Sequence, residues 1–448
     1  MPSATPRSIA IRPREEQTSR KLKHAPSTSY PTESYLNAAV QFPIITTHHA
    51  PDRPTKRPMP TPNKTIAVVN SSGRQAASFI RVASAVGFKV RAQLRNLDGI
   101  VATEISELPN VQVIVGDLYT RGDSSNPPSP GNDKNSGVNH ALIKRLFDGA
   151  QLAFINTTFY GDEVAIGKAL ADAAKEVGIE HYIYSSMPDH STWNPAWPSL
   201  PLWSSKYAVE KYIRSIGLPS TFLYTGIYNN NFTSLPYPLF CMELQSDGSF
   251  LWTAPFHPDI KLPWLDAEHD VGAAVLQLIK DGISQWGSQR IALAYEMLTP
   301  REVCRAFARG IGRPVRYCHS PVIEVKVKIP AGYRDQLTAL EQLYAIDKGD
   351  GSKQPPYFGH AKFEATCPEE ALALWEGNRG MEEYAREVFP LEEAANGLTW
   401  MNEDDEPAQE EEQDTDGEGD SDDEGLTMGG GIGSGDATPA RKEEGWLA

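Results

Sequence analysis

Residues 64–95, KTIAVVNSSGRQAASFIRVASAVGFKVRAQLR, contain the pattern that decides the fold. The short apolar run at 66–69 is typical of a parallel strand that is buried on both faces. The turn residues NSSG follow, and small and apolar residues then recur at helical spacing until Gly87 ends the helix. Residues 88–92 alternate between apolar and polar as a second strand. The order strand, turn, helix, strand predicts the first βαβ unit of a dinucleotide-binding fold.

The turn that opens this helix departs from the usual glycine-rich phosphate-binding pattern. On the spacing G-x-x-G-x-x-G, the sequence places Asn70, Gly73 and Ala76. Asparagine tolerates positive φ better than most residues other than glycine, and alanine is small enough for helix–strand packing. Gly73 lets the backbone approach a pyrophosphate, and N–H groups at the helix start would bind the phosphates. The alternative is a doubly wound domain that has lost its nucleotide.

Strand and helix patterns alternate through residues 63–225, which predicts a Rossmann-type, doubly wound parallel sheet. A polar stretch at 119–139 interrupts the pattern as an inserted loop, and a Trp- and Pro-rich stretch at 193–203 is expected to be a second loop. Residues 226–401 do not continue the alternation, and a hairpin is expected near residue 247. The predicted fold class is therefore α/β with a smaller α+β C-terminal region.

Both ends of the chain lack the apolar periodicity of folded elements. We expect residues 1–62 to be a disordered arm, and a mitochondrial presequence is the alternative to a solvated tail. Residues 402–448 are acidic and then Gly-rich, and we expect a disordered tail. The segment 403–424 holds fourteen Asp or Glu and no Lys or Arg, so removing these fourteen from the net charge of −16 leaves −2. The nearly neutral remainder has no general basic footprint, which argues against direct nucleic-acid binding.

The four cysteines, at 241, 304, 318 and 367, are scattered without a C-x-x-C pair. This spacing indicates a reducing compartment, without a disulfide framework or a cysteine zinc site. No apolar run reaches the length of a transmembrane helix or forms a signal-peptide core, so the sequence predicts no membrane segment.

A family resemblance rests on four strings: NSSGRQAAS at 70–78, FINTT at 154–158, HYIYSSMPDHS at 181–191 and GIYNNNFTSLPYPLF at 226–240. With them, residues 63–401 outside the inserted loop resemble the NmrA-like family of negative regulators of nitrogen metabolite repression in filamentous fungi. The resemblance implies an extended short-chain dehydrogenase fold that binds NAD or NADP and represses transcription by binding a GATA-type zinc-finger activator. It also implies a protein of the nucleus and the cytoplasm.

The resemblance further implies a set of cofactor contacts. By position, these are Asn70, Ser72, Gly73, Arg74 and Gln75 around the pyrophosphate; Arg95, Asp117 and Leu118 around the adenosine; and Asn156, Thr157, Thr158, Lys206, Tyr228, Asn229, Asn230 and Asn231 towards the nicotinamide. Arg95 ends the second strand, where an acidic residue would bind the ribose 2′-hydroxyl of NAD. An arginine there can stack on adenine and pair with a 2′-phosphate, so NADP is expected to bind too. The alternative role for Asn156 and for residues 229–231 is turn chemistry alone.

Dehydrogenases of this architecture use Tyr-x-x-x-Lys, in which the tyrosine moves the proton and the lysine holds the ribose. In the family register Lys206 is the lysine, and four positions before it lies Leu202, which cannot relay a proton. Tyr207 and Lys211 have the same spacing shifted by one residue, which rotates the pair by about 100° on a helix. We therefore expect no dehydrogenase activity, and the alternative is an NADP-dependent reductase that uses Tyr207 and Lys211.

Residues 263–280, PWLDAEHDVGAAVLQLIK, resemble the partner-binding segment of the family. The matching positions are Glu268, Asp270 and Gln277, which would face a basic zinc-finger module, although Ile279 replaces the phenylalanine of the family. An acidic patch attracts a cationic DNA-binding module over long range and competes with phosphate. The alternatives are that Asp270 only caps its helix, or that the protein is a redox sensor with another partner.

Overall fold

The computed structural model describes residues 62–120, 137–159, 161–344 and 354–401. The expected N-terminal arm, most of the expected inserted loop and the expected acidic tail lie outside these residues. At the base of that loop, β4 (Tyr119–Thr120) and β5 (Gly137–Val138) form a two-stranded antiparallel ladder.

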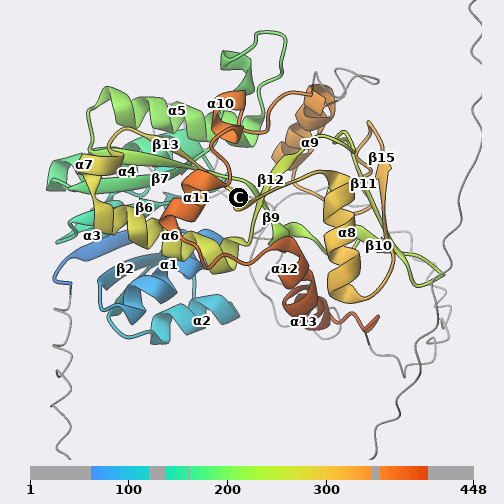
Figure 1. The fold of residues 1–448 in the computed structure, drawn as a ribbon. Helices are drawn as coiled ribbons and strands as arrows, with labels where there is room; N and C mark the ends of the chain where they lie inside the picture. The colour runs from blue at the N-terminus through green and yellow to red at the C-terminus, as the bar shows by residue number, and fades with distance from the viewer. Residues whose placement is uncertain (1–61, 121–136, 160, 345–353, 402–448) are drawn as a thin grey trace, which may run out of the picture. The chain divides into compact units, whose positions relative to one another are not determined.

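A seven-stranded parallel sheet organises the fold, in the order β13-β8-β7-β6-β1-β2-β3 (Figure 1). Its strands are β1 (Thr65–Val69), β2 (Lys89–Leu94), β3 (Val111–Val115), β6 (Leu152–Ile155), β7 (His181–Ser186), β8 (Ser220–Thr225) and β13 (Arg290–Leu293). The predicted first unit is confirmed, because β1 pairs in parallel with β2 on one side and with β6 on the other. The strand order reverses between β1 and β6, and doubly wound sheets bind ligands beyond the carboxyl ends of their strands at this point.

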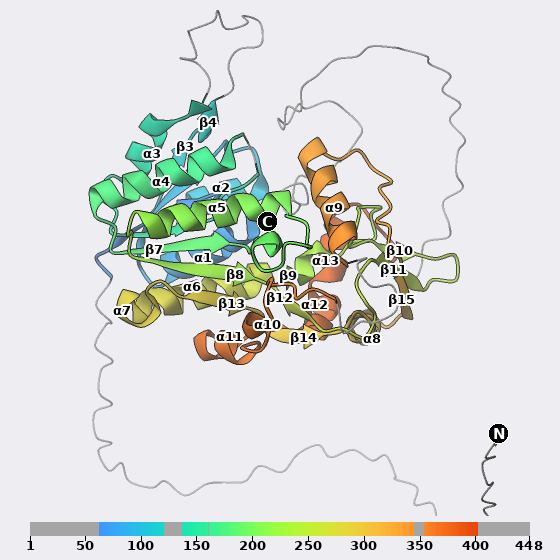
Figure 2. The same ribbon diagram turned by 90° about the horizontal axis from the view of Figure 1, so that it is seen from above.

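Helices cover both faces of the sheet (Figure 2). One face packs against α1 (Arg74–Ala85), α2 (Ile100–Glu107) and α6 (Ala267–Asp281), and the other against α3 (His140–Phe147), α4 (Glu163–Val177) and α5 (Pro201–Ser215). Ile66 and Val68 of β1 join the first core, whereas Ala67 and Val69 join the second. A strand that is buried on both faces needs a continuous apolar run, which is what the sequence of β1 provides.

The remaining elements form the smaller α+β region, which contains two three-stranded sheets in the orders β10-β11-β15 and β14-β12-β9. Its strands are β9 (Ile227–Tyr228), β10 (Met242–Leu244), β11 (Phe250–Ala254), β12 (Leu262–Leu265), β14 (Glu296–Leu298) and β15 (Val315–His319). Its helices are α8 (Pro300–Ile311), α9 (Ala331–Tyr344), α12 (Met381–Glu387) and α13 (Phe389–Ala395), and the short helices α7 (Ile283–Trp286), α10 (Ala361–Glu364) and α11 (Glu369–Leu374) accompany β13 and α6. The predicted hairpin is confirmed, since β10 pairs antiparallel with β11.

Two expectations from the sequence are wrong in detail. Residues beyond 225 return to the large sheet, because β13 pairs in parallel with β8 and α6 packs against α1. The predicted boundary at 225 therefore divides the polypeptide but not the sheet. Part of the loop expected at 193–203 is helical, because α5 begins at Pro201, and the fixed φ of proline suits the first position of a helix.

Helices α1 and α6 approach each other closely at Gly272. The Gly272 N–H donates to Ser78 Oγ at 3.0 Å, and a Cβ built on Gly272 would lie 2.4 Å from the carbonyl oxygen of Ser78. No side chain fits between the two backbones here, so glycine sets the distance between α1 and α6.

We expect Gly272→Ala to lower the free energy of unfolding, because the added methyl forces α1 and α6 apart. Overpacking of this kind costs about 1–3 kcal/mol, which exceeds the ~1 kcal/mol that alanine gains over glycine in helix propensity. Urea denaturation measures the change. The matched control is Gly99→Ala, where a Cβ meets no atom within 4 Å, and equal unfolding midpoints for the two variants would contradict the packing argument.

Candidate functional site

The phosphate-binding turn joins β1 to α1. Asn70 has a φ of 56°, so it adopts the left-handed conformation for which it was proposed to replace glycine. The Gly73 N–H donates to the Asn70 carbonyl at 2.9 Å, and Gly73 itself has an ordinary φ of −69°. A Cβ on residue 73 would lie 2.6 Å from Asn70 Nδ2 and 3.2 Å from the Asn70 carbonyl oxygen, so a larger residue there forces the Asn70 side chain to move. Ala76 is fully buried in the same core as Ile66, as its small size predicted.

The start of α1 carries no side-chain cap, because its N-cap residue is Gly73. By contrast, Asp162, Asp266 and Thr299 cap α4, α6 and α8 through their side chains. The first N–H groups of an α-helix have no partners within the helix, and the helix dipole favours negative charge beside them. The start of α1 therefore offers donors to an anion such as a pyrophosphate.

Gln93, at the carboxyl end of β2, was missed by the sequence analysis. Its side chain is buried, and Oε1 accepts from the Asn70 N–H at 3.2 Å while Nε2 donates to the Gly116 carbonyl at 2.8 Å. Gln93 thus ties the turn to the ends of β2 and β3. A buried polar residue at the end of a strand next to the turn is the signal that would have found it.

A first cavity lies beyond the carboxyl ends of the strands beside this turn. It brings together seven of the predicted cofactor residues: Asn70, Ser72, Arg95, Asp117, Leu118, Thr157 and Thr158. These residues follow four different strands, and their meeting in one cavity is the arrangement expected for the adenosine and pyrophosphate of a dinucleotide.

A second cavity, lined by many aromatic residues, lies where the large sheet meets the smaller region. Predicted residues Arg74, Tyr228, Asn230 and Asn231 line it, together with Leu202. Met187, Trp203, Tyr237, Phe240, Phe256, Tyr333 and Tyr357 are among the other residues that line it. The predicted cofactor residues are therefore divided between two cavities, and the second is the apolar one.

Five predicted cofactor residues are buried and line neither cavity: Gly73, Gln75, Asn156, Lys206 and Asn229. The Gln75 amide donates to the Tyr228 hydroxyl, and burial raises the pKa of that hydroxyl. Lys206 donates to the Thr157 carbonyl and forms an ion pair of 3.0 Å with Glu163 Oε1, a partner that the sequence analysis missed. The charge of Lys206 is thus neutralised within the protein.

The structure separates Leu202 from the shifted pair Tyr207 and Lys211. Leu202 is buried and lines the second cavity, whereas the described lining of neither cavity includes Tyr207. Lys211 Nζ and the Arg290 guanidinium lie 5.6 and 5.5 Å from the centre of the Tyr207 ring. Tyr207 therefore packs among cations towards β13, away from both cavities.

Several buried polar atoms of predicted cofactor residues have no hydrogen-bond partner among the described residues, and two of these residues, Arg74 and Asn230, line the second cavity. The atoms are Arg74 Nε, Gln75 Oε1, both polar atoms of the Asn229 side chain, and Asn230 Nδ2. Buried polar groups are normally satisfied, so this set of donors and acceptors fits a polar ligand. With the uncapped start of α1, the residues present fit a dinucleotide that extends from the first cavity towards the second.

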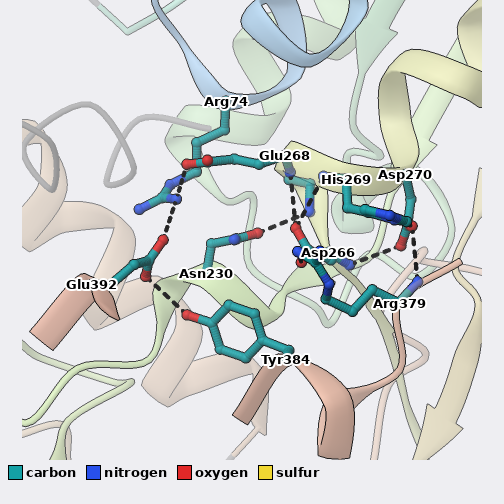
Figure 3. A network of polar contacts seen from close by, with 10 residues as sticks. Arg74, Asn230, Asp266, Glu268, His269, Asp270, Arg379, Tyr384 and Glu392 are labelled. Carbon is teal, nitrogen blue, oxygen red and sulfur yellow. Dashed lines mark hydrogen bonds and ion pairs between the residues drawn. The ribbon is translucent and has the colours of Figure 1, made fainter. Parts of the chain in front are cut away.

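Arg74 is part of a network of polar contacts that joins α1 to α6 and α13 (Figure 3). Its Nη1 donates to Glu268 Oε1 and, at 3.1 Å, to Glu392 Oε1, and Glu392 accepts from the Tyr384 hydroxyl at 2.9 Å. Burial opposes the charge of Arg74, but Glu392 and Glu268 more than offset that effect and raise its pKa. Two carboxylates thus bind Arg74 Nη1, and the contact of Arg74 with the pyrophosphate stays a prediction.

The start of α6 is held by internal hydrogen bonds. Asp266 caps the helix, since Oδ1 accepts from the Glu268 and His269 N–H groups at 3.1 Å. Asp266 Oδ2 forms an ion pair of 3.1 Å with Arg379. Asn230, which was predicted to contact cofactor, accepts from the Ala267 N–H at 2.9 Å. This contact of Asn230 Oδ1 spans 37 residues, so it is a tertiary bond to the start of α6 and not local turn chemistry.

The three predicted partner residues differ in their access to solvent. Asp270 is fully buried and accepts from the Asp266 N–H, the His269 ring and the Arg379 N–H, so the prediction that it faces a partner is wrong. Burial raises the pKa of Asp270. The Glu268 side chain is 25% exposed. Gln277 is half-buried and donates to Asp281 Oδ1 at 2.6 Å.

Other kinds of site are absent from the described part of the chain. None of its helices is long and apolar enough to cross a membrane. Within the same residues, no group of three His, Cys, Asp or Glu side chains is placed to hold a metal ion.

Sequence comparison matches residues 62–385 to the NmrA-like family. The chain is 67% identical to the nitrogen metabolite repression protein nmr of Neurospora crassa, over 79% of this chain and 74% of that protein. It is 52% identical to the nitrogen metabolite repression protein nmrA of Emericella nidulans, over 75% of this chain and 98% of that protein.

Comparison of structures finds crystal structures of NmrA, a negative transcriptional regulator, with a TM-score of 0.68 and 56% identity over 75% of this chain and 99% of that one. NmrA has also been crystallised with NAD and with NADP, in structures that match at TM-score 0.67 and 55% identity. These relatives bear out the predicted fold and agree with the predicted cofactors. The chain belongs to the NmrA-like family.

Proposed function

We propose that this protein is an NAD(P)-binding negative regulator of nitrogen metabolite repression, which binds a GATA-type zinc-finger activator and has no dehydrogenase activity. The observation that carries the proposal is the 67% identity to a nitrogen metabolite repression protein over 79% of the chain. Such a regulator acts in the nucleus and the cytoplasm. Because it binds NAD(P), repression depends on the concentrations of the nicotinamide cofactors.

One dinucleotide would extend over both cavities. The start of α1 and the Asn70 turn bind the pyrophosphate, and Arg95, Asp117 and Leu118 lie in the cavity that takes the adenosine. Arg95 suits a 2′-phosphate, so both NAD and NADP bind. The nicotinamide ring would supply a hydride carrier, and the residues that line the aromatic second cavity would hold it.

Leu202 supports the absence of catalysis. An enzyme of this architecture needs a proton donor four residues before the lysine, and the buried side chain at this position is apolar. Lys206 is occupied by Glu163 and the Thr157 carbonyl. The chain retains the means to hold a cofactor while lacking the group that would move a proton.

Glu268 is the residue that best supports a partner surface at α6. It is half-buried, whereas Asp270 is fully buried, and it lies in the first turn of the helix. A cationic zinc-finger module would gain from its charge and would compete with Arg74 for the same carboxylate.

The first prediction from this site concerns cofactor binding. We expect NAD and NADP each to raise the melting temperature, since a ligand present at 100 times its Kd stabilises the folded state by about 2.7 kcal/mol. Gly73→Leu should abolish the shift, because its side chain collides with the Asn70 turn. Thermal unfolding with each cofactor measures this, and the Gly99→Ala variant should respond as the parent chain does. Absence of a shift in the parent chain with both cofactors would contradict cofactor binding.

The second prediction concerns catalysis. We expect no steady consumption of NADPH or NADH with aldehyde, ketone or quinone substrates, as followed by absorbance, and no change in Tyr207→Phe. The outcome that supports the reductase alternative is consumption that Tyr207→Phe removes. Consumption that persists in this variant would also refute catalytic silence, through another proton donor.

The third prediction concerns the partner. We expect Glu268→Gln to weaken binding of the zinc-finger module of a GATA-type activator, chiefly through a slower association rate that also falls as salt rises. Surface plasmon resonance measures the rates. The matched control is Glu104→Gln, because Glu104 also pairs with an α1 arginine, Arg81, at 2.7 Å. Equal loss of binding in both variants, or unchanged binding in Glu268→Gln, would exclude a specific role for Glu268.

A further inference from the structure

An arginine row lies on the exposed face of α8, and the site described above does not use it. Arg301, Arg305 and Arg309 are spaced four residues apart and are exposed, whereas Val303 and Phe307 on the other face are fully buried. Residues four apart lie on one side of a helix, so these guanidinium groups follow one another along about 12 Å of its length. Arg313 follows Gly312, which ends α8 in the left-handed conformation, and is half-buried.

The counter-charges that the described residues supply to this row are weak. Arg301 pairs with Asp259 at 2.8 Å and Arg309 pairs with Glu382 at 2.6 Å, and all four side chains are more than 40% exposed. Exposed ion pairs of this kind contribute about 0–1 kcal/mol each, so other carboxylates can replace them. Among the described residues, Arg305 makes no hydrogen bond or ion pair.

An acidic segment of the same chain, residues 403–424, begins close in sequence to a residue that is held near the end of α8. Arg313 Nη2 donates to the Trp400 carbonyl at 2.8 Å, and its guanidinium lies 5.6 Å from the centre of the Trp400 ring. The Trp400 ring packs against Phe250 and Phe389, which fixes the point where the described chain leaves the smaller region. The acidic segment 403–424 follows three residues later, and its 22 residues can extend over as much as ~70 Å.

We propose that the acidic segment 403–424 binds the arginine row of α8 in the same molecule. Fourteen carboxylates without a compensating Lys or Arg meet a row of guanidinium groups whose last member, Arg309, lies four residues before Arg313, the residue that holds Trp400. Attachment through Trp400 makes the contact intramolecular, at an effective concentration on the order of millimolar, so weak individual pairs suffice. The bound segment covers a cationic surface that would otherwise attract polyanions.

Photo-crosslinking in the full chain tests the contact. A benzophenone amino acid replaces Gln413, in the middle of the acidic segment, and mass spectrometry maps the crosslinks. We expect crosslinks within one chain to α8 and residues 313–316, and a decrease of at least about threefold when salt rises from about 0.05 to about 0.5 M. Crosslinks spread over other elements, or formed only between chains, would overturn the proposal.

Charge-neutral variants separate this contact from general attraction. The triple change Arg301→Gln, Arg305→Gln and Arg309→Gln should lower the α8 crosslinks, whereas a control triple change of the exposed lysines Lys168, Lys175 and Lys211 to Gln should leave them unchanged. Thermal unfolding verifies that each variant is folded. Equal crosslinking in the two triple variants would overturn the proposal.

A second measurement uses heparin as a polyanion. Neutralising the carboxylates of 403–424 by Asp→Asn and Glu→Gln should raise the salt concentration at which the chain elutes from heparin. Adding the arginine triple change should remove that increase, because the uncovered row is then neutral. Unchanged elution after neutralisation of the segment, or an increase that survives the arginine changes, would show that 403–424 does not cover this row.

Discussion

The buried guanidinium of Arg74 is the interaction on which the arrangement of the candidate sites depends. It belongs to the first residue of α1, directly after the phosphate-binding turn, and its two carboxylate partners come from α6 and α13. Removing a charge from water costs several kcal/mol, which only well-placed partners offset. Two carboxylates face one guanidinium, so one negative charge is not balanced by Arg74. Water can reach Glu268, whose side chain is partly exposed, and the Tyr384 hydroxyl donates a hydrogen bond to Glu392. The carboxylates thereby fix the ends of three distant segments around one cation.

Polar contacts between distant segments also hold α6 against the large sheet, although the chain passes through the smaller region before it reaches α6. Its start is held by Arg379, Asp266 and Asn230, while its middle packs on α1 without room for a side chain at Gly272. The acidic residues at its start first satisfy these internal bonds. Of the carboxylates at this helix start, that of Glu268 keeps a side chain that is 25% exposed, whereas Asp266 and Asp270 are fully buried.

The sequence predicts correctly those elements that are determined by residues close together in the chain. The apolar run of β1, the asparagine of the turn and the small residue at 76 each act through neighbours in sequence, and each is placed as expected. The roles of Arg74 and Asp270 depend on residues that are 318 and 109 positions away, namely Glu392 and Arg379. No pattern around 74 or 270 encodes those distances.

The position of β13 shows the same limit at the level of topology. Its four residues resemble any short apolar strand. Their pairing with β8 depends on the path of the intervening hairpin and α6, which bring β13 back beside β8. The alternation that predicts a parallel sheet is interrupted in sequence but complete in space. A boundary drawn from the interruption therefore separates segments that share one core.

Cofactor binding and catalysis require different groups in the two cavities, so a protein of this fold can bind the cofactor without catalysing a reaction. The first depends on backbone N–H groups, a left-handed asparagine and a tight approach at Gly73, and none of these groups moves a proton. Catalysis in such a fold depends instead on one hydroxyl and one free ammonium group at the second cavity. Here a leucine lies at the first position, and Glu163 neutralises the ammonium group at the second. Under the proposed function, the residues at these two positions account for the absence of the reaction, whereas the turn and the start of α1 that would hold the pyrophosphate are independent of both positions.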